Sequence, residues 1–133
     1  GNILFDTKDK GYRIKDYTIL RDKKTILFEL LDNKDQKLMN FDLTKSKVNW
    51  ITDLGQVSGL FKKLIGNSFI NHGPIFTKNN NLIVGVKDEI YALNFTNGEI
   101  IWQYNTKKKI KALVYSDNNN SLYVGIKKSN KLK

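Results

Sequence analysis

The chain has 133 residues, and its 23 Lys and Arg against 13 Asp and Glu give a net charge of +10 at pH 7. This length allows one domain with a modest core. Cysteine is absent, which excludes a disulfide framework and a thiolate metal site. No apolar stretch approaches eighteen residues, so we predict no membrane contact by this segment.

In chain order, the first informative element is the segment 41–50, which ends in Trp50. Its pattern returns fifty-two residues later in the segment 93–102, where Trp102 matches Trp50. Self-similarity at a spacing of some tens of residues is typical of repeat architectures such as propellers. Because one repeat cannot bury both faces of its sheet alone, we expect neighbouring repeats to stack.

A connector over residues 55–73 interrupts the repeat. It contains five apolar residues at helical spacing, which fit a short amphipathic helix or an irregular strand: Val57, Leu60, Phe61, Leu64 and Ile65. We expect the connector to pack on a sheet. The alternative is that these five residues form an interaction surface.

The segment 81–102 predicts three short strands, at 82–86, 90–93 and 100–102, because these runs are rich in β-branched and aromatic residues. Asn97 and Gly98 separate the last two runs and predict a tight hairpin, since both residues tolerate positive φ. The runs are continuous instead of alternating, which is typical of a sheet that is covered on both faces.

The last element, 121–127, copies the segment 81–87 forty residues later. It belongs to a half repeat, and residues 1–16 form another. Unpaired half repeats leave sheet edges open, and open edges invite pairing. Together with Gly1 in place of Met, this indicates either a piece of a longer chain or edges covered by a second copy, so we predict a protein partner or a homodimer.

The residues of this repeat resemble the PQQ-like, or quinoprotein-type, β-propeller family. The matching positions are Val84, Gly85, Asp88, Ile90, Tyr91, Ala92, Leu93, Gly98 and Trp102, with Asp42 and Trp50 in the upstream copy. Asn40, Lys45, Ser46, Asn94 and Asn97 depart from the family pattern. The resemblance implies an all-β, antiparallel, incomplete propeller of about two and a half to three blades. It also implies structural docking between blades by Trp50, Trp102, Gly85, Gly98 and Gly125.

We therefore predict a single domain, 1–133, divided into a half blade, a blade, the connector, a second blade and a second half blade. The ranges are 1–16, 17–54, 55–73, 74–106 and 107–133. This layout describes repeats and leaves function open, because one fold carries many functions.

The irregular segment ahead of the strand at 81–87 is also similar in order and spacing to the luminal sensor domains of PERK-type stress kinases. That resemblance implies a non-catalytic module in the lumen of the endoplasmic reticulum, which senses stress by changing its self-association. Two alternatives remain open: a fragment of a PQQ-dependent dehydrogenase, and a bacterial envelope scaffold of the same repeat family.

Residues that could carry chemistry are scarce. His72 is the only histidine and stands in a predicted loop beside Gly73 and Pro74, so we predict no catalytic residue, no metal and no cofactor. Arg13 and Arg21 are the only arginines, whereas recognition of bases and phosphates favours the guanidinium group. We therefore predict no nucleic-acid partner.

Overall fold

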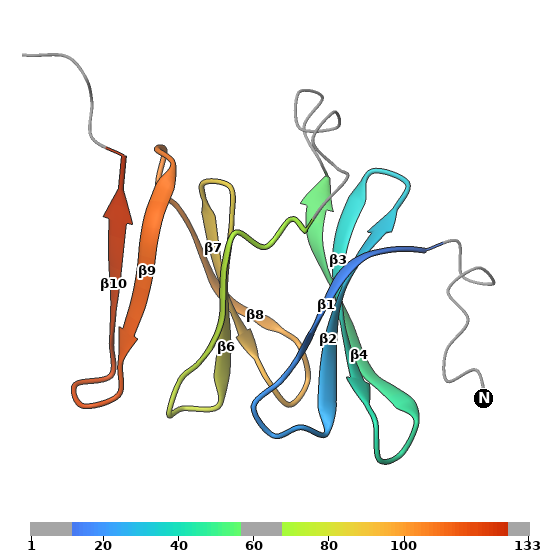
Figure 1. Cartoon of the computed structure of the whole chain (residues 1–133). Helices are drawn as coiled ribbons and strands as arrows, with labels where there is room; N and C mark the ends of the chain where they lie inside the picture. Colours follow the sequence, from blue (N-terminus) through green and yellow to red (C-terminus); the bar gives the residue numbers. More distant parts are fainter. Residues whose placement is uncertain (1–11, 57–67, 128–133) are drawn as a thin grey trace, which may run out of the picture. The chain divides into compact units, whose positions relative to one another are not determined.

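A computed structural model describes residues 12–56 and 68–127. The chain divides into two compact units, an N-terminal unit of residues 1–69 and a C-terminal unit of residues 70–133. The described residues form ten strands and no helix (Figure 1). The predicted all-β class with antiparallel sheets is therefore confirmed. No helix in the described ranges has the length and hydropathy of a membrane span.

The N-terminal unit holds one four-stranded antiparallel sheet, here called the N-terminal sheet. Its strands follow chain order: β1 (Arg13–Ile19), β2 (Thr25–Asp32), β3 (Asp35–Asp42) and β4 (Lys47–Gln56). Four strands in this up-and-down order are what a propeller blade contains. Because β1 pairs with β2, residues 13–16 belong to this sheet and not to a separate half blade.

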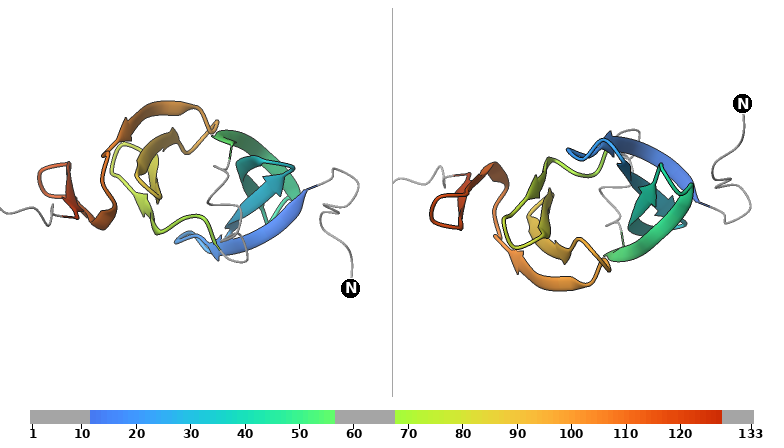
Figure 2. Two further views of the ribbon diagram at one scale, coloured as in Figure 1. Left: turned by 90° about the horizontal axis from the view of Figure 1, so that it is seen from above. Right: turned by 90° about the horizontal axis from the view of Figure 1, so that it is seen from below.

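The C-terminal unit holds a second four-stranded sheet, the C-terminal sheet, and a hairpin. The sheet contains β5 (His72–Phe76), β6 (Asn81–Val86), β7 (Glu89–Asn94) and β8 (Ile100–Asn105), again in chain order. The hairpin pairs β9 (Ile110–Ser116) with β10 (Ser121–Ile126). Figure 2 shows the hairpin as a layer alongside the strands of this unit.

The two sheets share a register irregularity, which confirms the repeat in three dimensions. Trp50 lies opposite Asn40 and Val48 lies opposite Phe41, so Asn49 is an extra residue on β4. Trp102 lies opposite Ala92 and Ile100 lies opposite Leu93, so Ile101 is an extra residue on β8. The fourth strand of each sheet therefore bends at the same place relative to its tryptophan.

The core of the C-terminal sheet lies on its two central strands. Every residue from Leu82 to Val86 and from Ile90 to Leu93 is buried, as the continuous apolar runs predicted. Ile83, Ile90 and Ala92 form a cluster with Ile110 of the hairpin. The N-terminal sheet has its own cluster, formed by Leu30, Met39 and Phe41.

The third and fourth strands of each sheet are joined by similar loops. The Asp42 carboxylate accepts hydrogen bonds from the N–H groups of Thr44 and Lys45, and the Asn94 side chain does the same two and three residues on. The predicted two-residue Asn-Gly turn is wrong. The loop runs over residues 95–99, and Gly98 alone adopts positive φ, at 78°, because the Asn94 side chain supplies the turn.

The connector prediction falls largely outside the described residues. β4 continues to Gln56, and β5 begins at His72, so both ends of the predicted range 55–73 belong to strands. Val57, Leu60, Phe61, Leu64 and Ile65 lie outside the described ranges. The blade count and the single-domain layout stay predictions.

Candidate interaction site

Exposed apolar side chains concentrate on strands at the edges of the sheets. β1 and β8 are edge strands, and β10 pairs only with β9 among the described residues. Their exposed large side chains are Ile14, Tyr17 and Ile19 on β1, Ile100, Ile101, Trp102 and Tyr104 on β8, and Tyr123, Val124 and Ile126 on β10. An edge that combines apolar side chains with free main-chain groups favours pairing with another chain.

Trp102 stands out among these residues, because it is 40% exposed whereas its repeat counterpart Trp50 is only 7% exposed. The face of the sheet that carries Trp102 also carries Ala92, which lies opposite it in the ladder. The hairpin covers this face at β6 and β7 through the cluster of Ile83, Ala92 and Ile110. On β8 the cover is incomplete, so the indole of Trp102 stays half open to solvent.

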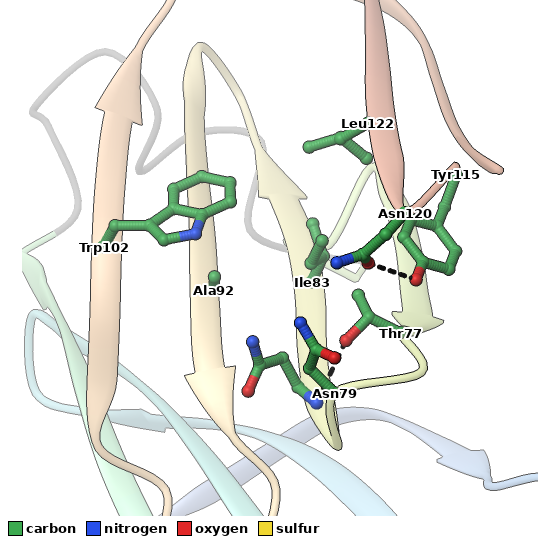
Figure 3. A pocket seen from close by; sticks show the side chains of 9 residues that line it. Thr77, Asn79, Ile83, Ala92, Trp102, Tyr115, Asn120 and Leu122 are labelled. Carbon is green, nitrogen blue, oxygen red and sulfur yellow. Dashed lines mark hydrogen bonds between the residues drawn. The ribbon is translucent and has the colours of Figure 1, made fainter. Parts of the chain in front are cut away.

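A pocket of about 170 Å³ lies beside Trp102 (Figure 3). Its lining comes from the β5–β6 turn, the sheet and the hairpin: Thr77, Asn79, Asn81, Ile83, Ala92, Trp102, Tyr115, Asn120 and Leu122. Tyr115 donates its hydroxyl proton to Asn120 Oδ1 at 2.5 Å and accepts from the Lys78 N–H at 3.0 Å. These bonds hold one wall in place, and the apolar part of the lining comes from Ile83, Ala92, Trp102 and Leu122.

The hairpin is held against the sheet where β9 begins. His72, predicted in a loop, is instead the first residue of β5, and its Nε2 lies 3.0 Å from the carbonyl oxygen of Ile110. A carbonyl only accepts, so the imidazole donates from Nε2. A Cβ on Gly85 would approach His72 Cβ to 3.2 Å. Glycine at this position therefore permits the close packing of β6 on β5.

The other predicted docking glycines have different surroundings. A Cβ on Gly125 would lie 3.4 Å from the Cβ of Ala112, its neighbour across the hairpin. Gly98 serves the left-handed position of its loop. Their role in docking between blades stays a prediction.

A buried carboxylate in the N-terminal unit was not predicted from the sequence. Glu29 is 2% exposed and lies in β2. It accepts hydrogen bonds from the Ser68 hydroxyl at 2.7 and 2.8 Å and from the Phe69 N–H at 2.7 Å. Glu29 thus fixes Ser68 and Phe69, which lie in the last part of the predicted connector, to the N-terminal sheet. The one sequence feature that could have indicated a buried carboxylate is the charge of Glu29 inside the apolar run of β2.

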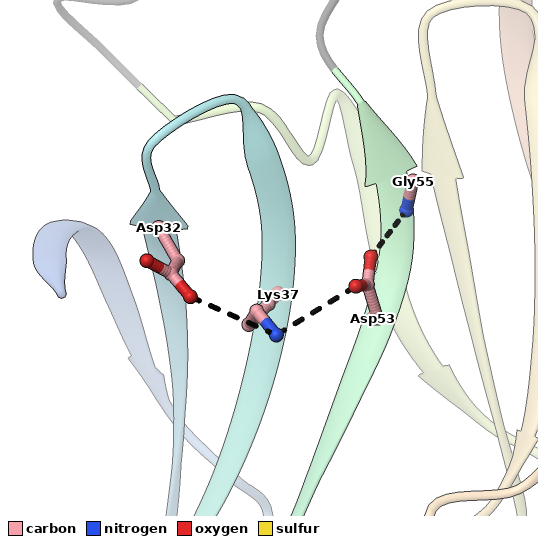
Figure 4. A network of polar contacts seen from close by, with 4 residues as sticks. All are labelled: Asp32, Lys37, Asp53 and Gly55. Carbon is pink, nitrogen blue, oxygen red and sulfur yellow. Dashed lines mark hydrogen bonds and ion pairs between the residues drawn. The ribbon is translucent and has the colours of Figure 1, made fainter. Parts of the chain in front are cut away.

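The same sheet carries a surface ion-pair network (Figure 4). Lys37 Nζ lies 3.6 Å from Asp53 Oδ2 and 3.9 Å from Asp32 Oδ2, and Asp53 also accepts from the Gly55 N–H at 2.8 Å. Partly exposed pairs of this kind contribute little to stability. The network joins three neighbouring strands and leaves Lys37 fully engaged within its own sheet.

Within residues 12–56 and 68–127, His, Asp and Glu side chains do not gather in a group of three that could hold a metal. The titratable group with a resolved shift that bears on the fold is Asp42. The Thr44 hydroxyl, followed by the Lys45 N–H, donates to its carboxylate and lowers the pKa of Asp42 below its ordinary value of 3.8. Both donors belong to the loop after β3, so the lowered pKa of Asp42 depends on the folded conformation of this loop.

No protein-family model matches the chain, and a search of curated proteins finds no match. Among solved structures, the chain is similar to BamB from Moraxella catarrhalis, with a TM-score of 0.45 and 18% sequence identity. The similarity covers 70% of this chain and 24% of that chain. A likeness of this extent carries no argument about function, which must come from the edges and the pocket described above.

Proposed function

We propose that this chain is a non-catalytic binding module that recognises other proteins, including a second copy of itself, through exposed strand edges. The observation that carries the proposal is the concentration of exposed apolar side chains on β1, β8 and β10. Solvated edge strands are usually blunted by charge, proline or cover. Here β10 carries no charged residue between Ser121 and Ile126.

More specifically, we propose that the chain forms a homodimer and acts as a luminal sensor. β1 is the edge best suited to self-association, since Tyr17 and Ile19 are 58% and 57% exposed. Antiparallel pairing of two copies of one strand satisfies two-fold symmetry, which closed dimers use. A sensor of this type would respond to any ligand that favours one association state.

The test is the solution mass of the chain over a range of concentrations, measured by light scattering at low and moderate salt. We expect a concentration-dependent dimer that is stronger at moderate salt, because screening weakens repulsion between two copies of net charge +10. Ile19→Lys should weaken the dimer at least tenfold by placing a charge in the paired edge.

The matched control is Asn118→Lys, which adds the same charge in the exposed β9–β10 turn and should leave the dimer unchanged. A folded monomer at every concentration, verified by circular dichroism, would contradict self-association. Equal weakening by both lysine variants would mean that net charge, and not the β1 edge, controls assembly.

A further inference from the structure

The turn between β9 and β10 carries a motif that the proposed function does not use. Residues 119–121 read Asn-Asn-Ser, which has the form of the acceptor sequence for N-linked glycosylation, Asn-x-Ser/Thr. A second acceptor sequence, Asn-Phe-Thr at residues 94–96, starts at the end of β7. Because an attached glycan is bulky and polar, it needs an asparagine whose side chain faces solvent in the folded chain. The two acceptor sequences differ in this respect.

The β9–β10 turn places two neighbouring asparagines on opposite faces of the hairpin. Asn120 Oδ1 accepts the hydroxyl proton of Tyr115, which lines the pocket on the side of the hairpin that packs on the C-terminal sheet (Figure 3). Asn119 Nδ2 instead donates to the Tyr123 hydroxyl at 3.1 Å. Tyr123 is 54% exposed and alternates with Leu122, which packs on the sheet. Asn119 therefore lies on the face of the hairpin that points away from its own sheet.

The amide and the hydroxyl that define the acceptor sequence lie together at this turn. Residues 117–120 form the turn, and all four are exposed. Ser121 Oγ donates to the Asn119 carbonyl oxygen at 3.2 Å, so the hydroxyl stands beside the main chain of the acceptor residue. The Asn119 Nδ2 carries two hydrogens. Glycosylation replaces one of them, so the modified amide keeps an N–H for its hydrogen bond to Tyr123.

The acceptor sequence at residues 94–96 is instead built into the loop between β7 and β8. Asn94 is half-buried, and its Oδ1 accepts from the Thr96 N–H at 2.8 Å. The Thr96 hydroxyl accepts from Asn80 Nδ2 at 3.0 Å. Phe95 packs edge-on against Phe76, with ring centroids 4.9 Å apart. All three residues of this motif hold the loop in place, so a glycan on Asn94 would have to fit against these contacts.

We propose that Asn119 carries an N-linked glycan in the folded chain and that Asn94 does not. This inference rests on the proposed function, because such glycans are attached in the lumen, where a luminal sensor would fold. The co-reactant is an oligosaccharide joined through pyrophosphate to a lipid. Asn119 Nδ2 attacks the anomeric carbon of the first sugar. The bond between this nitrogen and the carbon forms as the bond from the carbon to pyrophosphate breaks, the lipid pyrophosphate leaves, and the nitrogen loses one proton to solvent.

A glycan at this turn would also change the surface of the hairpin. Tyr123 lies opposite Val114 in the ladder, and the two side chains are 54% and 56% exposed. Exposed apolar area of this kind favours association with other chains. A sugar attached beside Tyr123 would give this pair a polar cover and leave β1 as the edge that pairs in the proposed dimer.

The test is the occupancy of Asn119 in the full chain, directed to the endoplasmic reticulum of a eukaryotic cell by an added cleavable signal peptide. An N-glycan amidase removes the glycan and converts the modified asparagine to aspartate, which peptide mass spectrometry locates. We expect one glycan, on Asn119, in the fraction that circular dichroism shows to be folded. Asn119→Gln and Ser121→Ala should lose it completely. Ser121→Thr, which keeps the hydroxyl, should retain it.

Thr96→Ala is the matched control, because it removes the other acceptor sequence and should leave the glycan on Asn119 unchanged. An unmodified Asn119 in the folded fraction would overturn the proposal. A glycan on Asn94 in the folded fraction would overturn it as well, since the contacts of that loop would then not exclude the sugar.

The remaining outcomes separate this inference from the function on which it rests. If Asn119 stays unmodified while the Ile19-dependent dimer persists, the assignment of the glycan is wrong and the proposed function stands. If Asn119 is glycosylated and the folded chain is a monomer at every concentration, the glycan site is confirmed and self-association is wrong. If the protein in its own cells resists the amidase although the directed chain is glycosylated, the glycan and the luminal location are both overturned.

Discussion

Ser46 and Gly98 occupy equivalent left-handed positions, with φ of 52° and 78°, in the loops before β4 and β8. An L-residue in the left-handed region lowers the free energy of unfolding by roughly 1–2 kcal/mol. Glycine avoids this cost, but its greater conformational entropy in the unfolded chain offsets about 0.4–1 kcal/mol of the gain. We therefore expect Ser46→Gly to raise the free energy of unfolding by about 0.5–1 kcal/mol and Gly98→Ser to lower it by at least as much.

Urea unfolding of both variants measures this difference. Ser116→Gly, at the end of β9 and outside the left-handed region, is the control and should destabilise the chain. A loss of stability in Ser46→Gly would show that its backbone does not hold the left-handed conformation in solution.

Asp42 makes part of the stability pH-dependent. Its pKa is lowered in the folded chain, first by the Thr44 hydroxyl and then by the Lys45 N–H. A lowered pKa contributes stability that is fully present above the unfolded value of 3.8 and is lost as the pH falls through the folded value. Asp42→Asn places at this position the residue type found at the equivalent Asn94. We expect the free energy of unfolding of this variant to decrease less steeply as the pH falls.

The measurement is the difference in unfolding free energy between wild type and Asp42→Asn in a pH series from 7 downward. The difference should be constant near neutral pH and should shrink once the pH falls below 3.8. A difference that does not change with pH would mean that the carboxylate charge adds nothing to its hydrogen bonds.

At the scale of the element, Glu29 of β2 binds Ser68 and Phe69 in the last part of the predicted connector. Glu29→Gln keeps the shape but replaces one acceptor oxygen by a donor that faces the Ser68 and Phe69 donors. We expect a loss of about 1–3 kcal/mol in the free energy of unfolding. Glu99→Gln, at an exposed loop position, should change it by less than about 0.5 kcal/mol. If Glu29→Gln and Glu99→Gln changed the free energy of unfolding in urea equally, the hydrogen bonds of Glu29 would not stabilise the fold.

The sequence predicted strands well where local pattern determines them. β6 and β7 are continuous apolar runs. Short runs of this kind are typical of strands that are buried on both faces of a sheet. The loop at Gly98 was mispredicted, because the Asn94 side chain competes with the two-residue turn. The partners of Glu29 lie thirty-nine and forty residues away, and contacts at that distance leave no local signal.

The candidate site was predictable only in part. The matching positions of Trp50 and Trp102 suggested the same role for both, and the ladder does place them equivalently. Their exposure differs, because burial depends on which strands cover each sheet. The exposed apolar side chains of β10 could be placed only once its pairing with β9 was known.

At the scale of the whole molecule, the charge and the edges act against each other. A net charge of +10 keeps copies apart and favours solubility, while apolar edges favour pairing. Salt shifts this balance toward association, and an acidic partner gains from the same charge that repels a second copy.

The bulge beside each tryptophan has one more consequence. A bulge increases the local twist of a sheet, and the two four-stranded sheets carry theirs at the same register position. Beside each tryptophan the two outer strand pairs therefore share one local bend, whereas only β3 and β4 carry a second register shift, between Gln36 and Lys37. A chimera that exchanges the two loops together with the strands up to each tryptophan would therefore keep the local twist of the recipient sheet.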